Sequence, residues 1–260
     1  MAEILRFQLL HGSLALVDLD GLWAAADAKG GIHVTVVKNM HDLLATLAFE
    51  LSGSQLTHLL NCFRKIWEGS SQNAMVDLLT FIQRLAADGC IPHMRNETLE
   101  LIWTLAGHAG TPPDIVDLVL AAHIEILTRS NCSLFIQKKW LATSLEAAKI
   151  HRVIPMLRHF ESIFKDVKFP KTLFNPPDPA FYSVNDVLMQ LMELMRVCCT
   201  RASRPGLELF LGRSGGDALV SALEQILSLI KVFFLFFVLE ERRITTAVRL
   251  FRSGYFPQYS

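Results

Sequence analysis

A histidine and a cysteine, His58 and Cys62, stand four residues apart in the stretch SGSQLTHLLNCFRKIW, residues 52–67. In a helix this spacing puts both side chains on one face, where an imidazole nitrogen and a thiolate sulfur could bind the same metal ion. Cys90 and His93, which enclose the dipeptide Ile-Pro, would complete a set of two cysteines and two histidines. That donor set is common in structural zinc sites, so the residue types permit zinc binding.

Packing is the alternative interpretation of the same residues. Cys62 precedes Phe63 on the apolar side of the predicted helix, where a cysteine usually acts as a small buried hydrophobic residue. We therefore expect Cys62 to be largely buried against neighbouring helices and His58 to bind nothing. On this interpretation we assign no metal ligand and no cofactor-binding residue, and we expect no cofactor.

Thiol catalysis would need an exposed cysteine with a lowered pKa beside a histidine that a third polar group orients. Asn131-Cys132, at the start of a predicted helix, comes nearest to this arrangement, and we expect Cys198 and Cys199 to be buried as reduced thiols. The glycines of RPGLELFLGRSGGD, residues 204–217, do not have the spacing of a phosphate-binding loop, and we interpret this segment as a connection between helices. We assign no catalytic residue.

The overall composition narrows the class of protein. The 25 basic and 25 acidic side chains cancel, so no net field favours nucleic acid or an anionic membrane as a partner. An odd number of cysteines in helical patterns favours reduced thiols inside a cell. The N-terminus has Arg6 as its one early basic residue and carries Asp18 and Asp20, which argues against a signal peptide. We expect a cytoplasmic protein.

Helical patterns would position the residues named above. They follow one another between residues 34 and 166 with short breaks and no convincing strand pattern. Ser52 and Gln55 have the spacing of a capping box, and Thr111-Pro-Pro-Asp predicts a helix start with Thr111 as its cap. The predicted helices span about 34–50, 53–67, 72–87, 96–107, 112–127, 133–148, 153–166 and 184–200, and another begins at Asp217.

This rhythm of helices predicts an all-α fold. Seven successive helices with short connections favour an armadillo- or HEAT-like stack of antiparallel helix pairs, an α-solenoid, over a four-helix bundle. A compact irregular helical domain is the alternative, since no repeat consensus is evident. We divide the chain into a helical array (1–167), a proline-rich loop (168–183), a continuation of the array (184–225), and an apolar helix with a poorly ordered tail (226–260).

The segment ILSLIKVFFLFFVLEERR, residues 226–243, is unusually apolar. Its apolar run is interrupted by Lys231 and is shorter than the roughly 20 residues of a spanning helix. Three interpretations are possible: a membrane span, a core helix or a truncated end. We favour a truncated end and expect that deleting residues 226–260 leaves the array folded.

Two stretches resemble a known family: DLDGLWAAADAKGGIHVTVVKNMHDLLATLAFELSGSQLTHLLNCFRKIWEG, residues 18–69, and LELIWTLAGHAGTPPDIVDLVLAAHIEIL, residues 99–127. They are similar to the non-catalytic region of the fat-facets, or ubiquitin-specific protease 9, class of large deubiquitinases. The resemblance covers residues 18 to about 155 and weakens toward 225. It implies an armadillo-type array that precedes a cysteine protease domain. The family's Gly-Asn-Thr-Cys and Gly-His-Tyr-like boxes do not occur here, so the resemblance supplies no catalytic residue and suggests a fragment, a truncated product or an isolated paralogue.

Three functions follow as expectations. The first is a non-catalytic scaffold that presents helix faces to protein partners, including partners of the ubiquitin pathway. The second is a fragment of a cysteine-type deubiquitinase that does not itself carry the activity. The third is a helical protein tethered to a membrane through residues 226–239, which we disfavour.

Overall fold

The fold is entirely helical wherever a computed structural model describes it. The described residues are 3, 7, 8, 11, 15–26, 34–86, 92–128, 132–150, 152–166, 184–213, 215 and 217–252, and none of them forms a strand. They belong to two compact units, Met1–Arg129 and Ser130–Ser260. The predicted all-α class is confirmed.

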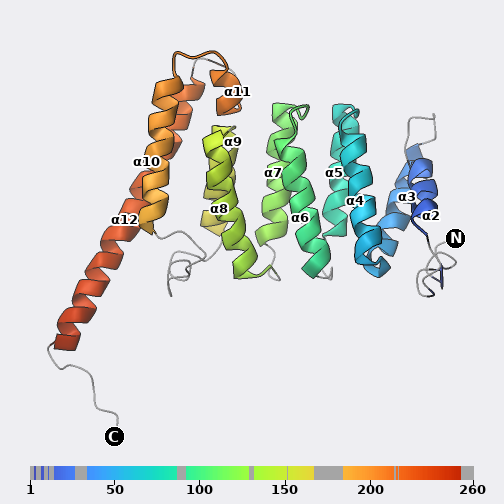
Figure 1. Ribbon diagram of the computed structural model, residues 1–260, viewed down its shortest axis with the longest axis horizontal. Coiled ribbons are helices and arrows are strands. Elements are labelled where there is room, and N and C mark those ends of the chain that lie inside the picture. Colours follow the sequence, from blue (N-terminus) through green and yellow to red (C-terminus); the bar gives the residue numbers. More distant parts are fainter. Residues whose placement is uncertain are drawn as a thin grey trace, which may run out of the picture. The chain divides into compact units, whose positions relative to one another are not determined.

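The N-terminal unit is a stack of helices in two layers (Figure 1). Helix α2 packs on α4 and α4 on α6, while α3 packs on α5 and α5 on α7. Successive helices run in opposite directions, so the members of each layer are parallel. The helices are α2 (Leu16–Ala26), α3 (Val34–Leu47), α4 (Gly53–Trp67), α5 (Gln72–Leu85), α6 (Pro92–Gly107) and α7 (Pro113–Thr128), with a short 3-10 turn at Ala48–Glu50.

Buried aromatic and aliphatic side chains hold the two layers together. The rings of Phe63 on α4 and Phe81 on α5 meet edge to face, with centroids 5.2 Å apart. Helices α4 to α7 each bury apolar residues at helical spacing, which is the pattern that predicted them. Fully buried residues of this core include Leu59, Leu60, Phe63, Trp67, Ile82, Leu85, Leu99, Ile102, Val119 and Ile126.

The helix starts agree with the sequence at one place and differ at another. At α4 the predicted capping box is confirmed: the Ser52 hydroxyl accepts from the Gln55 amide, and the Gln55 side chain accepts from the Ser52 amide. Helix α7 begins at Pro113, one residue after the predicted start. The hydroxyl of Thr111, the predicted cap, donates to the Leu105 carbonyl and accepts from the Trp67 indole, both at 2.8 Å.

The described residues of the C-terminal unit form the helices α8 to α12 (Figure 1). Helix α8 pairs with α9, and α10 pairs with α12. The two pairs pack on each other through α9 with α12 and through α8 with α10, while the short α11 contacts α9 and α12. Their bounds are α8 (Leu134–Ile150), α9 (Val153–Asp166), α10 (Val184–Arg201), α11 (Leu207–Leu211) and α12 (Ala218–Arg252).

Helix α11 lies in the segment that we interpreted as a connection. It is bounded by Gly206 and Gly212, which both have left-handed backbone conformations, with φ of 82° and 73°. A Cβ atom at position 212 would lie 2.9 Å from Cα of Arg152 and 3.0 Å from Cδ of Pro155. Only glycine therefore fits at position 212, where α11 ends against the start of α9.

Helix α12 corrects two expectations about the C-terminal segment. The predicted boundary at residue 225 lies inside this helix, and the predicted poorly ordered tail is helical as far as Arg252. A buried stripe, Ala218, Ala222, Ile226, Leu229 and Phe233, packs within the C-terminal unit and explains why the helix continues across residue 225. Residues 253–260 lie outside the described residues.

The stretch Ala218–Leu235 of α12 is long and apolar enough to cross a membrane by length and composition, and 28% of it is buried inside the protein. It starts before the segment 226–239 that suggested a membrane tether, and its buried stripe serves packing. Core helices of soluble proteins can be equally long and apolar, so this stretch gives only weak support to a membrane span.

The observed units also differ from the predicted domains. The sequence pattern placed the first division at the proline-rich loop, 168–183, which lies outside the described residues. The structure instead divides the chain between Arg129 and Ser130. Helices α8 and α9, before residues 168–183, share their core with α10 and α12, after them, so the helices on both sides belong to one unit.

A buried histidine links α8 to α9. Ser144 donates its hydroxyl hydrogen to the Trp140 carbonyl at 2.6 Å, so its oxygen accepts from Nδ1 of His159 at 2.7 Å. His159 is 1% exposed, and burial lowers its pKa from 6.5 to about 3. The imidazole therefore stays neutral in the folded protein at any ordinary pH.

We expect this histidine to make stability depend on pH. In the unfolded chain this histidine binds a proton as the pH falls below 6.5, whereas in the folded protein it does not until about pH 3. The free energy of unfolding is therefore not reduced by this histidine above pH 6.5, and it decreases progressively as the pH falls toward 3. The expected loss between pH 7 and pH 5 is about 2 kcal/mol. Urea denaturation followed by circular dichroism measures it. His159→Gln should abolish this part of the pH dependence and His108→Gln should not. If the free energy of unfolding changed equally with pH in both variants, His159 would not be its source.

Candidate functional site

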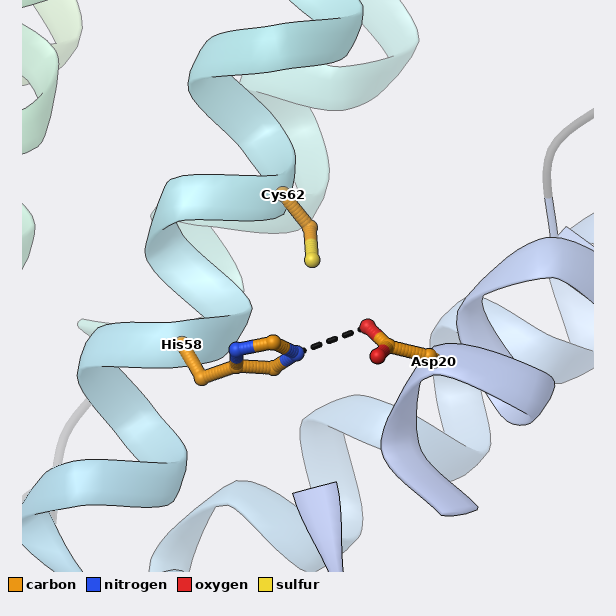
Figure 2. Close-up of side chains that lie close together, drawn as sticks. All are labelled: Asp20, His58 and Cys62. Atoms are coloured by element: carbon orange, nitrogen blue, oxygen red, sulfur yellow. Dashed lines mark hydrogen bonds and ion pairs between the residues drawn. The ribbon is translucent and has the colours of Figure 1, made fainter. Parts of the chain in front are cut away.

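Three side chains with metal-binding atoms meet between α2 and α4 (Figure 2). A carboxylate oxygen of Asp20, a ring nitrogen of His58 and the sulfur of Cys62 all lie within 4.8 Å of one another. Nε2 of His58 is 2.7 Å from Oδ1 of Asp20, a hydrogen-bonding distance. Side-chain exposure is 54% for Asp20 and 29% for His58, and Cys62 is half-buried. The cluster therefore lies at the edge of the core, where solvent reaches it.

Both helices place their residues for simple geometric reasons. His58 and Cys62 are one turn apart on α4 and share a face, as the sequence spacing predicted. Asp20 follows Leu19, which is 2% exposed and anchors α2 in the core. The packing of α2 on α4 then brings the Asp20 carboxylate over the His58 imidazole.

The arrangement does not favour thiol catalysis. Burial, and then the negative charge of Asp20, raise the pKa of the Cys62 thiol, whereas a nucleophilic cysteine needs a lowered pKa. In a catalytic triad the acid and the nucleophile engage opposite nitrogens of the imidazole. In Figure 2 the Cys62 sulfur lies toward the Asp20 side of the ring, above Nε2, and Nδ1 lies on the side away from Asp20.

The other residues that the sequence singled out do not join this cluster in the described structure. Cys90 lies outside the described residues, and His93 lies in α6 at a position whose side chain is not described. Cys132 is half-buried. Cys198 is buried, as expected, and burial raises its pKa to about 11, but Cys199 is exposed and corrects the prediction.

Sequence reasoning anticipated only part of the arrangement at the opening pair. Cys62 lies against the edge of the core, in the direction that the packing interpretation predicted. Asp20 was noted for its charge and was not linked to His58, which follows 38 residues later. No local spacing signals such a partner, because only the packing of α2 on α4 creates the contact.

A second surface lies on the layer formed by α3, α5 and α7. Arg84 forms an ion pair with Asp42 of α3, and Gln83 donates to Glu125 of α7 at 2.9 Å. Two apolar side chains are exposed on the same helices, Val76 at 38% and Leu118 at 48%. We call the exposed residues Val76, Asp77, Asp114, Asp117, Leu118 and Glu125 the α5–α7 surface.

Stacked antiparallel helix pairs with continuous cores define an armadillo-type helical array. The sequence matches the UBP24/USP9X/USP9Y ARM repeat family over residues 1–201, which is more than half of the chain. The chain belongs to this family, and the resemblance found in the sequence is confirmed.

Similar proteins carry the names of very long enzymes. Ubiquitin carboxyl-terminal hydrolase 9X of Mus musculus is 41% identical over 168 residues, 63% of this chain and 6% of that protein. Probable ubiquitin carboxyl-terminal hydrolase FAF of Drosophila melanogaster is 39% identical over 133 residues, 51% of this chain and 5% of that protein. Ubiquitin carboxyl-terminal hydrolase 24 of Homo sapiens is 28% identical over 121 residues, 46% of this chain and 4% of that protein. The chain thus spans a small part of each relative, and what it shares with this family is its ARM repeat segment.

Proposed function

We propose that this chain is a non-catalytic interaction scaffold that binds a protein partner on the α5–α7 surface. The observation that carries the proposal is the exposed pair Val76 and Leu118 on neighbouring helices. Exposed apolar side chains within a polar rim can form the buried centre of a protein interface.

The register of the two helices puts Val76 and Leu118 side by side. Gln83 contacts Glu125, and each residue of this pair follows Val76 or Leu118 by seven positions. Seven residues are two helical turns, and α5 and α7 are parallel. The apolar pair therefore lies on the same seam as the polar pair, about 10 Å toward the start of both helices.

The acidic residues of the α5–α7 surface indicate the charge that its partner should carry. The charged residues of α5 and α7 are Asp77, Arg84, Asp114, Asp117 and Glu125, and the single guanidinium is paired with Asp42. Asp114 is one turn before Leu118 and shares its face. The surface fits a partner segment with apolar side chains flanked by lysine or arginine, because complementary charge speeds association and selects the partner. Since the relatives are named ubiquitin carboxyl-terminal hydrolases, we propose a partner from the ubiquitin pathway.

Quantitative affinity purification from cell extract tests this surface. The full chain is compared with Val76→Ser/Leu118→Ser and with the matched control Val220→Ser/Leu227→Ser, which changes exposed residues of α12. We expect the surface variant to lose a specific protein at least fivefold while the control retains it, with capture that weakens as salt rises. Equal recovery by all three proteins would overturn the proposal.

Catalysis is the second candidate, because the relatives are named as hydrolases. The thiol of Cys62 has a raised pKa, which supports a non-catalytic role for this chain. We expect no cleavage of ubiquitin-rhodamine. Turnover that one cysteine-to-serine substitution abolished would favour the enzyme.

The proposed location is the cytoplasm. Among the described residues Cys62, Cys198 and Cys199 are free cysteines, which suits a reducing compartment. Fluorescence microscopy of the tagged chain, with cytosolic and membrane markers, tests this location.

A further inference from the structure

We propose that Asp20, His58 and Cys62 form a zinc site that joins α2 to α4. The three donors are a carboxylate oxygen, an imidazole nitrogen and a thiol sulfur, within 4.8 Å of one another. Zinc accepts all three donor types in one tetrahedral site. A thiolate and an imidazole together disfavour magnesium and calcium, which prefer oxygen donors.

The geometry requires only small side-chain movements. Zinc bonds of about 2.0–2.3 Å place the ligand atoms of a tetrahedral site about 3.3–3.7 Å apart. The Nε2 and Oδ1 atoms, now 2.7 Å apart, would separate slightly as the metal takes the place of the hydrogen between them. That hydrogen moves to Nδ1 as the neutral imidazole changes tautomer. The Asp20 side chain is 54% exposed, so it is free to turn. His58 and Cys62 are already fixed on one face of α4 (Figure 2).

Charge balance also suits a zinc ion. Its two positive charges would equal the combined charge of one carboxylate and one thiolate. Binding breaks the S–H bond, forms a Zn–S bond and releases one proton to solvent. Zinc affinity should therefore increase with pH.

Three protein donors leave one tetrahedral position for water. Among the residues that the structure describes, the group contains these three donors. Solvent reaches the cluster through the exposed Asp20 side, so a water molecule can complete the coordination. The metal would hold the first helix of the described array to α4 more firmly than the Asp20–His58 hydrogen bond alone, because exposed pairs of this kind contribute little.

Metal titration of the full chain tests the site. The protein is stripped with a chelator, kept reduced, and titrated with cobalt(II), which gives a thiolate-to-cobalt absorption band only when sulfur is a ligand. We expect one cobalt per chain, displaced by one zinc, and a higher Tm with zinc. Cys62→Ser should abolish the band, while Asp20→Asn and His58→Gln should each weaken binding at least tenfold.

Two control variants distinguish this site from other thiols. Cys199→Ser changes an exposed free cysteine and should leave both the band and the affinity unchanged. Cys90→Ser tests the set of cysteines and histidines that the sequence alone suggests. An absence of stoichiometric binding would overturn the proposal, and so would a band that survives Cys62→Ser. Loss of binding in Cys90→Ser, with full binding in Asp20→Asn, would overturn the role of Asp20. None of these outcomes depends on the α5–α7 surface.

Discussion

Replacing Phe233 with alanine is expected to destabilise the C-terminal unit by about 3–5 kcal/mol, the usual cost of removing a buried phenylalanine ring. The Phe233 side chain is 0% exposed. Its ring centroid lies 4.8 Å from that of Phe164 and 5.8 Å from that of Phe160, both on α9. Truncation to alanine would leave a cavity between α9 and α12 that close-packed helices fill poorly. Hydrogen exchange of α9 peptides, read by mass spectrometry in the full chain, measures the loss.

The next residue provides the matched control. Phe234 is 56% exposed, so Phe234→Ala should change stability by less than about 0.5 kcal/mol. Equal protection of α9 in the Phe233 and Phe234 variants would show that α12 does not stabilise this unit. Deleting residues 226–260 would remove Ile226, Leu229 and Phe233 together, so we now expect that deletion to unfold the unit around α9 and α10.

Most of the helices could be predicted because their apolar stripes are local. The stripes of α4, α5 and α9 repeat at helical spacing, and the Ser52–Gln55 capping box marks one start. Helix α2 was missed because its pattern is weak: Leu16 and Val17 are exposed, and Leu19 is buried. Helix α11 has five residues between glycines, too few to show a stripe.

The length of α12 was underestimated from the sequence. The segment 226–243 is unusually apolar, and this suggested a truncated end or a membrane. Within Ala218–Leu235, whose side chains the structure describes, a stripe that includes Ile226, Leu229 and Phe233 is buried, while Leu227 and Phe234 are exposed. Composition alone does not reveal which face of an apolar helix finds a partner in α9 and α10.

Part of the candidate site could also be predicted from the sequence, and part could not. The spacing of His58 and Cys62 could be read from the sequence, because one helical turn separates them. Asp20 could not, because its position depends on the packing of α2 against α4. Thr111 is a related case: its local context is typical of a helix cap, but its hydroxyl is used by Trp67 and Leu105 in the core.

Thr111→Val is therefore expected to cost much more than the loss of a helix cap on the surface. Thr111 is 3% exposed and Trp67 is 0% exposed. Valine keeps the shape and removes the oxygen, so the Trp67 indole N–H loses the acceptor 2.8 Å away. Leaving a buried donor unsatisfied costs about 1–3 kcal/mol, and the lost bond to the Leu105 carbonyl brings the expected total to about 2–4 kcal/mol. Hydrogen exchange of α4 and α7 peptides in the full chain measures it.

A surface threonine and a double-mutant cycle separate this bond from general effects of the substitution. Thr104 on α6 is exposed and donates to the Glu100 carbonyl of its own helix, so Thr104→Val should change stability by less than about 0.5 kcal/mol. Trp67→Phe removes the indole N–H, and its cost should fall by at least about 1 kcal/mol when Thr111 is already valine, because the two groups are coupled. Additive costs in the cycle, or equal costs for the two threonine variants, would show that the Trp67–Thr111 bond does not hold α4 to the start of α7.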